Sequence, residues 1–386
     1  MSTYLGLDES TLRDIGGEYT AREISHQPKV WRDVMVNLDE VRAQLDAFLS
    51  PLLARENLRV ILSGAGTSAF AGKVVSPHLA RITGRRFEAV STTDIVAAPA
   101  ECFAEQVPTL VISFARSGNS PESVAAVQLA DQLLKECYHL ILTCNPDGAL
   151  AKASDASDRM FCLLMPEGTN DRSFAMTSSY TSMMLSALCI FDAEQGTAEQ
   201  VEKLSQVTEQ LLEEQITPMK ALAEQNFDRV VFLGSSSFQG LAQEASLKFL
   251  ELTAGKVASV FDSPMGFRHG PKSIVNDKTV IVEFIANASY TRQYDLDLLA
   301  ELRRDNKAAH ILAISDHKGD VRKGNVIMLA QELKTENVWL SFPFIALAQV
   351  FAFFKSVQLQ ITPDNPCPTG EVNRVVQGVV IHPYSG

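Results

Sequence analysis

The chain of 386 residues has an ordinary globular composition, with 46% hydrophobic and 21% charged residues. Its length suggests two domains. The 34 basic and 46 acidic residues give a formal net charge of -12, which disfavours binding to nucleic acid or to an anionic membrane. An anionic substrate would therefore need a local site of positive potential, such as the N-terminus of a helix.

The sequence also disfavours export, a membrane span and a metal centre. Residues 1–4 lack the features of an export signal, and the apolar run Val338–Phe354 is shorter than the roughly 20 residues that cross a bilayer, so we expect a buried helix there. The cysteines show neither a CxxC pair nor zinc-like spacing, so we expect reduced thiols in a cytoplasmic protein. These are Cys102, Cys137, Cys144, Cys162, Cys189 and Cys367.

A helical segment opens the chain, and a strand-turn-helix pattern follows it. Residues 1–50 are mainly helical by their apolar periodicity. Next come a short apolar strand at Arg59–Leu62, a turn of small residues at Ser63–Ser68 and a helix over Ala69–Ile82. This order is typical of an α/β domain.

Three more strands and a long helix complete this half of the chain. The strand Thr109–Phe114 runs into a polar turn, in which Ser120 caps a helix that starts with proline. Further strands are predicted at His139–Thr143 and Met160–Leu164, followed by an apolar helix over Ser178–Phe191.

The same order of elements returns about 170 residues later, after a predicted linking helix over residues 200–225. The strands beginning at Arg229, Thr279 and His310 repeat those beginning at Arg59, Thr109 and His139. Short strands that alternate with helices imply parallel sheets flanked by helices. We therefore predict an α/β fold of two doubly wound, mostly parallel sheets related by duplication. The expected domains are a helical segment over 1–50, a first domain over 51–199 and a second over 200–386.

Small polar residues follow two strands of the first half, at the edge where ligands of such sheets bind. Free backbone N–H groups at a helix start, with short hydroxyl side chains, suit a phosphate dianion. The candidate donors are Gly66, Thr67, Ser68, Ser117 and Ser120. The nucleotide alternatives are weaker, because the Gly-x-Gly turn lacks a third glycine and no Walker sequence occurs. The alternative that these serines only cap helices stays open.

Two carboxylates and a lysine share one face of a helix predicted in the second half. Glu244, Lys248 and Glu251 are spaced i, i+4, i+7, with leucines beside them, and a partly buried carboxylate next to a lysine can transfer protons. An exposed ladder of salt bridges is the alternative. Glu244 is the expected ion-pair partner of Lys248, which leaves Glu251 as the acid–base group. His269, in a loop ending in Gly-Pro, is a second proton-transfer candidate.

Four motifs together resemble the SIS (sugar isomerase) family over roughly residues 40 to 386. They are Gly64–Ser68, Ala115–Ser120, Glu244–Glu251 and His269–Pro271. The resemblance implies two tandem SIS domains, similar to the isomerase half of glucosamine-6-phosphate synthase. The branch that looks most similar is the galactosamine-6-phosphate deaminase/isomerases, also labelled tagatose-6-phosphate ketose/aldose isomerases. Arg172–Ser178 resembles the stretch that completes the sugar site there, which adds Ser173.

The resemblance also implies roles for these residues. Glu251 would move the proton between C2 and C1 of the sugar, and His269 would assist ring opening. The family places its histidine loop at a subunit boundary, so the resemblance also implies a homodimer or higher oligomer. Thr67, Ser68, Ser117 and Ser120 would bind the phosphate. Neither a metal nor an organic cofactor is implied.

This chain departs from the synthase at three points. Arg116 stands in the phosphate motif and would supply charge, no lysine for a Schiff base occurs over residues 373–377, and the glutaminase half is absent. The missing lysine disfavours covalent imine catalysis, and the absent glutaminase half favours ammonia release. We therefore expect conversion of a 2-amino-2-deoxyhexose 6-phosphate, galactosamine 6-phosphate in this branch, to tagatose 6-phosphate and ammonia through an enolamine.

Other functions stay open from the sequence alone. The same residues would serve a plain ketose/aldose isomerase or a fructosamine-6-phosphate deglycase. A regulator that senses sugar phosphates is a third alternative, although residues 1–50 are too short and acidic for a convincing DNA-binding segment. The galacto or gluco configuration depends on the shape of the pocket.

Overall fold

A computed structural model describes residues 3–317, 321, 324–376 and 378–385 of the chain. Gln377, which ends the tail segment considered above, lies outside these residues. The chain forms two compact units that we name after their central strands. The β5 unit comprises Lys29–Asp171, Ser178–Val201 and Val372–Gly386, and the β10 unit comprises Met1–Pro28, Arg172–Thr177 and Glu202–Glu371. The units alternate along the chain, whereas the domains expected from the sequence are contiguous, and those domain boundaries stay a prediction.

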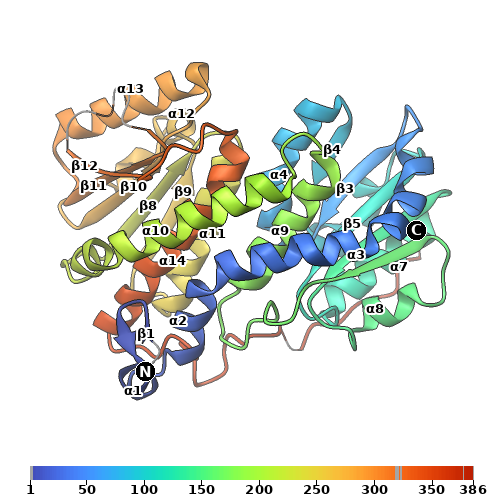
Figure 1. The fold of residues 1–386 in the computed structure, drawn as a ribbon, viewed down its shortest axis with the longest axis horizontal. Helices are drawn as coiled ribbons and strands as arrows, with labels where there is room; N and C mark the ends of the chain where they lie inside the picture. Colours follow the sequence, from blue (N-terminus) through green and yellow to red (C-terminus); the bar gives the residue numbers. More distant parts are fainter. Residues whose placement is uncertain (1–2, 318–320, 322–323, 377, 386) are drawn as a thin grey trace. The chain divides into compact units, whose positions relative to one another are not determined.

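The β5 unit contains a five-stranded sheet in the order β4-β3-β5-β6-β7, in which every pairing is parallel (Figure 1). Its strands are β3 (Arg59–Ser63), β4 (Arg86–Ala89), β5 (Thr109–Ala115), β6 (Cys137–Thr143) and β7 (Met160–Leu164). Its helices are α4 (Thr67–Thr83), α5 (Thr92–Ala97), α6 (Pro99–Cys102), α7 (Pro121–Leu133), α8 (Ala149–Ser154) and α9 (Ser178–Phe191). Most of α3 (Gln27–Leu53) also belongs to it.

The β10 unit contains a second five-stranded parallel sheet in the order β12-β11-β10-β8-β9. Its strands are β8 (Arg229–Gly234), β9 (Ala258–Asp262), β10 (Thr279–Phe284), β11 (His310–Ser315) and β12 (Asn325–Met328). Its longer helices are α2 (Glu18–Ser25), α11 (Ser237–Leu252), α13 (Ser289–Asp305), α14 (Asn337–Gln358) and most of α10 (Ala198–Ala223). Short elements complete it: β1 (Thr3–Tyr4), β2 (Leu7–Asp8), α1 (Glu9–Asp14), α12 (Pro264–Phe267) and the 3₁₀ helix η1 (Pro271–Ile274).

The two sheets confirm the α/β fold and the duplication. The two sheets have the same topology: the first strand of each unit along the chain, β3 or β8, lies between the second and the third, and the fourth and fifth follow the third. The residue before the first helix of each sheet adopts the same unusual backbone conformation: φ 55° and ψ -126° at Gly66, and φ 56° and ψ -123° at Ser236. The short strands β4, β9 and β12 were not predicted: β4 and β9 are interrupted by polar residues, and β12 has only four residues.

Helix α14 is the buried helix that the apolar run Val338–Phe354 predicts. It is long and apolar enough to cross a membrane by composition, but its most apolar window is entirely buried inside the protein. Trp339, Phe342 and Phe344 are fully buried core side chains on this helix. The apolar character of α14 is therefore explained by packing in the core.

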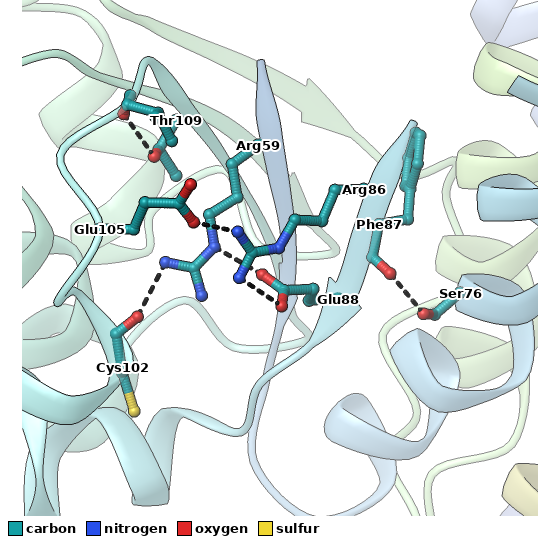
Figure 2. Close-up of polar contacts among 9 residues, drawn as sticks. Arg59, Ser76, Arg86, Phe87, Glu88, Cys102, Glu105 and Thr109 are labelled. Carbon is teal, nitrogen blue, oxygen red and sulfur yellow. Dashed lines mark hydrogen bonds and ion pairs between the residues drawn. The ribbon is translucent and has the colours of Figure 1, made fainter. Parts of the chain in front are cut away.

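A network of ion pairs holds the start of β3 to β4 in the β5 unit (Figure 2). Arg59 and Arg86 both bind Glu88, and Arg86 also binds Glu105. Arg59 additionally donates from Nη1 to the carbonyl oxygen of Cys102 at 2.9 Å. Burial alone would raise the pKa of Glu88, but the hydrogen bonds and charges of both arginines outweigh burial and lower that pKa below 4.5.

We expect Arg59→Met to lower the free energy of unfolding by about 1–3 kcal/mol near neutral pH, because it removes buried charge-assisted hydrogen bonds. Arg86→Met should cost less than about 1 kcal/mol, because Arg86 is half exposed. A carboxyl whose pKa is lowered by folding stabilises the protein above its unfolded pKa of 4.5. The difference between wild type and Arg59→Met should therefore shrink as the pH falls below that value. Urea unfolding at pH 7 and pH 3.5 measures both effects, and an equal difference at both pH values would contradict the assignment.

Candidate active site

The turn after β3 brings the N-terminus of α4 to the edge of the sheet. Gly66 is exposed at this turn, and Thr67 and Ser68 form the first residues of α4 with 4% and 5% exposure. The backbone N–H groups of Ser68 and Ala69 donate to the carbonyl oxygens of Ala65 and Gly66, so the hydroxyls of Thr67 and Ser68 and the dipole of α4 are the groups that favour an anion here. The three residues therefore lie where the sequence predicts an anion site.

The loop after β5 lies on the neighbouring strand and has a fixed backbone. Asn145 donates from its side chain to the carbonyl oxygen of Ser117 at 2.8 Å, and the backbone N–H of Leu150 donates to the carbonyl oxygen of Gly118 at 3.1 Å. Ser120 caps α7 as predicted, since its hydroxyl accepts a hydrogen bond from the backbone N–H of Ser123. Ser117 and Ser120 are both partly exposed. The loop is thus preformed, and we name residues 116–120 the phosphate loop after their expected ligand.

Arg116 has a different environment from the one expected for a phosphate ligand. Its side chain is buried, and Nη2 donates to the carbonyl oxygen of Arg374 in the C-terminal tail at 2.7 Å. The sequence did not point to Arg374, because contacts between a loop and a distant tail leave no local pattern. Direct binding of phosphate by Arg116 stays a prediction.

Ser173 lies in the β10 unit and is fully buried. Its backbone N–H donates to Oε2 of Glu23 at 3.2 Å, and its hydroxyl donates to the same carboxylate. Glu23 also accepts a hydrogen bond from the backbone N–H of Arg172. The visible role of Ser173 is therefore to anchor its segment on α2, and its predicted contact with the sugar stays untested.

Lys248 lies buried between two carboxylates on α11. Its ammonium forms a hydrogen-bonded ion pair with Oε2 of Glu251 and lies 3.6 Å from Oε1 of Glu244. The side chains of Lys248 and Glu244 are 0% exposed, whereas that of Glu251 is 21% exposed. The alternative of an exposed ladder is therefore wrong. Glu244 pairs with Lys248 as expected, but the i,i+3 contact with Glu251 is the closer one.

The partial exposure of Glu251 gives its carboxylate access to solvent that Glu244 lacks. A carboxylate that is both oriented by a lysine and reachable has what an acid–base group needs. These observations agree with the assignment of Glu251, rather than Glu244, as the proton-transfer group, with Lys248 as the residue that orients it. The assignment itself stays a prediction.

His269 is exposed in the turn between α12 and η1, as the sequence predicts. Phe267 anchors this loop in the core of the β10 unit. Arg268 donates to Glu301 on α13 at 3.0 Å, and Lys272 lies 2.6 Å from Asp305 on the same helix. The loop is thus attached to α13 on both sides of His269, which positions the imidazole.

The strand ends of the β10 unit are occupied by carboxylates of the protein itself. Asp295 accepts hydrogen bonds from the hydroxyl of Ser235 at 2.6 Å and from the backbone N–H of Ala286 at 2.9 Å. Asp316 accepts from the side chain of Asn287 at 2.7 Å. Burial raises the pKa of Asp295, although these two donors favour its charged form. The donors that an anion would use here are therefore already engaged.

One group of possible metal ligands lies on α7 and β6, among the residues that the structure describes. Donor atoms of Asp131, Cys137 and His139 lie within 4.8 Å of one another. Nε2 of His139 is 2.9 Å from Oδ1 of Asp131 and 3.5 Å from Sγ of Cys137. Burial raises the pKa of Cys137 to about 12, which disfavours the thiolate that ligates metals. Hydrogen bonds between the buried His139 and the exposed Asp131 account for this cluster.

The predicted site residues divide between the two units. The β5 unit contains Gly66, Thr67, Ser68, Arg116, Ser117 and Ser120, and the β10 unit contains Ser173, Glu244, Lys248, Glu251 and His269.

A family model described as the SIS domain matches residues 52–192 and 222–338, so that each match contains one of the two sheets.

The chain is similar to proteins of named activity over nearly its whole length. It is 50% identical over 374 residues to the D-galactosamine-6-phosphate deaminase AgaS of Escherichia coli, covering 95% of this chain and 96% of that protein. It is 45% identical over 383 residues to the D-galactosamine-6-phosphate deaminase AgaS of Shewanella sp. (strain ANA-3), covering 98% and 95%. The crystal structure of tagatose-6-phosphate ketose/aldose isomerase from Escherichia coli has a TM-score of 0.91 and 47% identity, covering 96% of this chain and 98% of that chain.

Substitutions of Ser117 and Ser120 separate anion binding from helix capping. We expect Ser117→Ala to weaken the binding of inorganic phosphate about tenfold and to change stability by less than about 0.5 kcal/mol. Ser120→Ala should also weaken phosphate binding, and it should cost about 1 kcal/mol of stability because it removes a helix cap. Ser76→Ala is the control, since Ser76 hydrogen-bonds within the β5 unit to the carbonyl oxygen of Phe87. Calorimetry that finds wild-type phosphate affinity in both variants and in the double variant would rule out this site.

Proposed function

The chain belongs to the SIS domain family, and we propose that it is an enzyme that converts galactosamine 6-phosphate to tagatose 6-phosphate and ammonia. The observation that carries this proposal is the 50% identity, over 95% of the chain, to a D-galactosamine-6-phosphate deaminase. The geometry of α11 supports it, because a partly exposed carboxylate oriented by a buried lysine suits the transfer of a proton between carbon atoms.

The proposed reaction begins with binding of the phosphate. The phosphate binds to the hydroxyls and backbone N–H groups of the turn after β3 and of the phosphate loop, which fixes the sugar. The imidazole of His269 transfers the proton that opens the ring. Glu251 then removes the proton from C2, which gives an enolamine between C1 and C2.

Return of this proton to C1 converts the enolamine to an imine at C2. Water adds to the imine carbon, and the C–N bond breaks, so that the products are a ketose phosphate and ammonia. The only other reactant consumed is one water molecule. Positioned acid–base groups of this kind typically contribute about 10²–10⁴-fold to the rate.

Lys248 acts through Glu251 rather than on the sugar in this scheme. Its ammonium is fully buried and binds the Glu251 carboxylate, so it fixes the direction in which that carboxylate points. A homodimer or higher oligomer and a cytoplasmic location are further proposals. The first rests on the family resemblance, and the second is supported by the six cysteines, all of them described and free.

We expect the purified protein to release ammonia from galactosamine 6-phosphate in preference to glucosamine 6-phosphate, and to release none from unphosphorylated galactosamine. A coupled assay for ammonia over this panel measures the preference. Interconversion of tagatose 6-phosphate with an aldose phosphate but no ammonia would instead identify a plain isomerase. Release of an amine from fructosamine 6-phosphate alone would identify a deglycase, and binding without turnover of any of these sugars would point to a sensor.

We expect Glu251→Gln to abolish exchange of the C2 hydrogen with solvent deuterium while leaving the affinity for the substrate within about threefold. Glutamine keeps the size of the side chain but cannot accept the proton. Glu244→Gln is the matched variant on the same helical face, and it should retain exchange at more than about a tenth of the wild-type rate. Proton NMR in deuterium oxide measures exchange, and loss of exchange in Glu244→Gln but not in Glu251→Gln would reverse the two roles.

A further inference from the structure

Two arginines connect the C-terminal tail to the phosphate loop within the β5 unit. Arg116 donates from Nη2 to the carbonyl oxygen of Arg374 at 2.7 Å. Arg374 in turn donates from its own Nη2 to the carbonyl oxygen of Asp171, and the same nitrogen lies 3.4 Å from Oδ1 of Asn170. Three separate segments of the chain therefore meet through two guanidinium groups.

The phosphate loop is held from two sides. On one side, the carbonyl oxygens of residues 116–118 accept hydrogen bonds from the last residue of β6 and from residues that follow it: Thr143, Cys144, Asn145 and Leu150. These bonds fix the carbonyl oxygens of the loop but leave the side chain of Arg116 to the tail. The guanidinium of Arg116 is used to hold the tail.

The tail has a second attachment in the same unit. Gln132 on α7 donates to the carbonyl oxygen of Tyr384 at 3.1 Å, and the Tyr384 side chain packs on the core cluster that contains Ile95 and Phe103. The tail segment near Arg374 is therefore fixed by the two arginines, while its end is fixed independently by packing. Loss of the arginine contacts should free the first part without detaching the second.

We propose that Arg116 and Arg374 are positioning residues that hold residues 372–376 against the phosphate loop, so that the order of the tail and the binding of phosphate support each other. The expected change in KM for galactosamine 6-phosphate rests on the proposed function. A ligand that binds the phosphate loop restricts the loop that carries Arg116, which lowers the entropy cost of holding the tail. The tail contact in turn keeps the Arg116 side chain in one conformation.

The chemistry of arginine explains why this residue stands in the loop. A guanidinium is planar and presents several donors in fixed directions, so it can join a carbonyl oxygen to a loop at a defined geometry. A lysine at position 116 would keep the positive charge but lose this geometry. Arg116→Lys therefore distinguishes a residue that acts through the tail from one that only supplies charge.

The first test uses trypsin, because Arg374 is itself a cleavage site whose side chain is bound in the folded protein. We expect Arg116→Gln and Arg116→Lys to release the peptide Val375–Gly386 at least about tenfold faster than wild type, and inorganic phosphate to slow its release from wild type. Mass spectrometry identifies the peptide. The control is Arg85→Gln, because Arg85 also donates to a backbone carbonyl in this unit, that of Arg55 at 2.6 Å. The control should release the peptide at the wild-type rate.

The second test is a double-mutant cycle on turnover of galactosamine 6-phosphate. We expect Arg116→Gln and Arg374→Ala each to raise KM about tenfold with a smaller change in kcat, and the double variant to match the single ones rather than to reach about a hundredfold. Additive effects, or wild-type behaviour of Arg116→Lys in both tests, would overturn the proposal. Because the trypsin test needs only inorganic phosphate, it remains decisive if the wild-type protein fails to release ammonia.

Discussion

In each unit, the structure depends on the close approach of a helix to the end of the strand before it: α4 to β3, and α11 to β8. A Cβ atom at Gly64 would lie 2.6 Å from the backbone of Ser68, and one at Gly234 would lie 2.4 Å from the carbonyl oxygen of Phe238. Only glycine fits at either position. The approach brings the first turn of α4 to the edge of its sheet, where the positive end of the helix dipole and the hydroxyls of Thr67 and Ser68 can attract an anion. In the other unit it fixes the start of α11, and thereby the positions of Glu244, Lys248 and Glu251 along that helix.

The two copies of this arrangement have diverged in how they use the strand ends. In the β10 unit, Asp295 and Asp316 accept the hydrogen bonds of hydroxyl, amide and backbone donors at that edge. In the β5 unit, the corresponding loop carries serines and Arg116. A protein with a net charge of -12 gains no general attraction for a sugar phosphate, so the sign of the local groups decides where it binds. The duplication thus yields one sheet edge suited to an anion and one that supplies its own anions.

The sequence was sufficient for the parts of this fold that have a strong local pattern. The central strands and their helices follow from apolar runs and caps, and the repeat fixes the two sheets. The edge strands could not be found, because a half-exposed strand such as β9 lacks a continuous apolar run. The shared helical face of the charged residues on α11 follows from their spacing, but the closer pairing of Lys248 with Glu251 depends on side-chain conformations that spacing does not determine. The contact of Arg116 with Arg374 joins positions 258 residues apart, and a single sequence carries no signal for it.

The second carboxylate on α11 eases the change of charge that the proposed reaction requires of Glu251. In the proposed reaction Glu251 accepts a proton and becomes neutral, so its ion pair with Lys248 is lost at that moment. An unpaired ammonium that is fully buried would be costly, and this cost would oppose the proton transfer. Glu244, also fully buried and 3.6 Å from the ammonium, still pairs with it while Glu251 is neutral. Glu244 thus lowers the cost of neutralising the partly exposed Glu251, an indirect effect of less than about tenfold on exchange that requires no contact with the sugar.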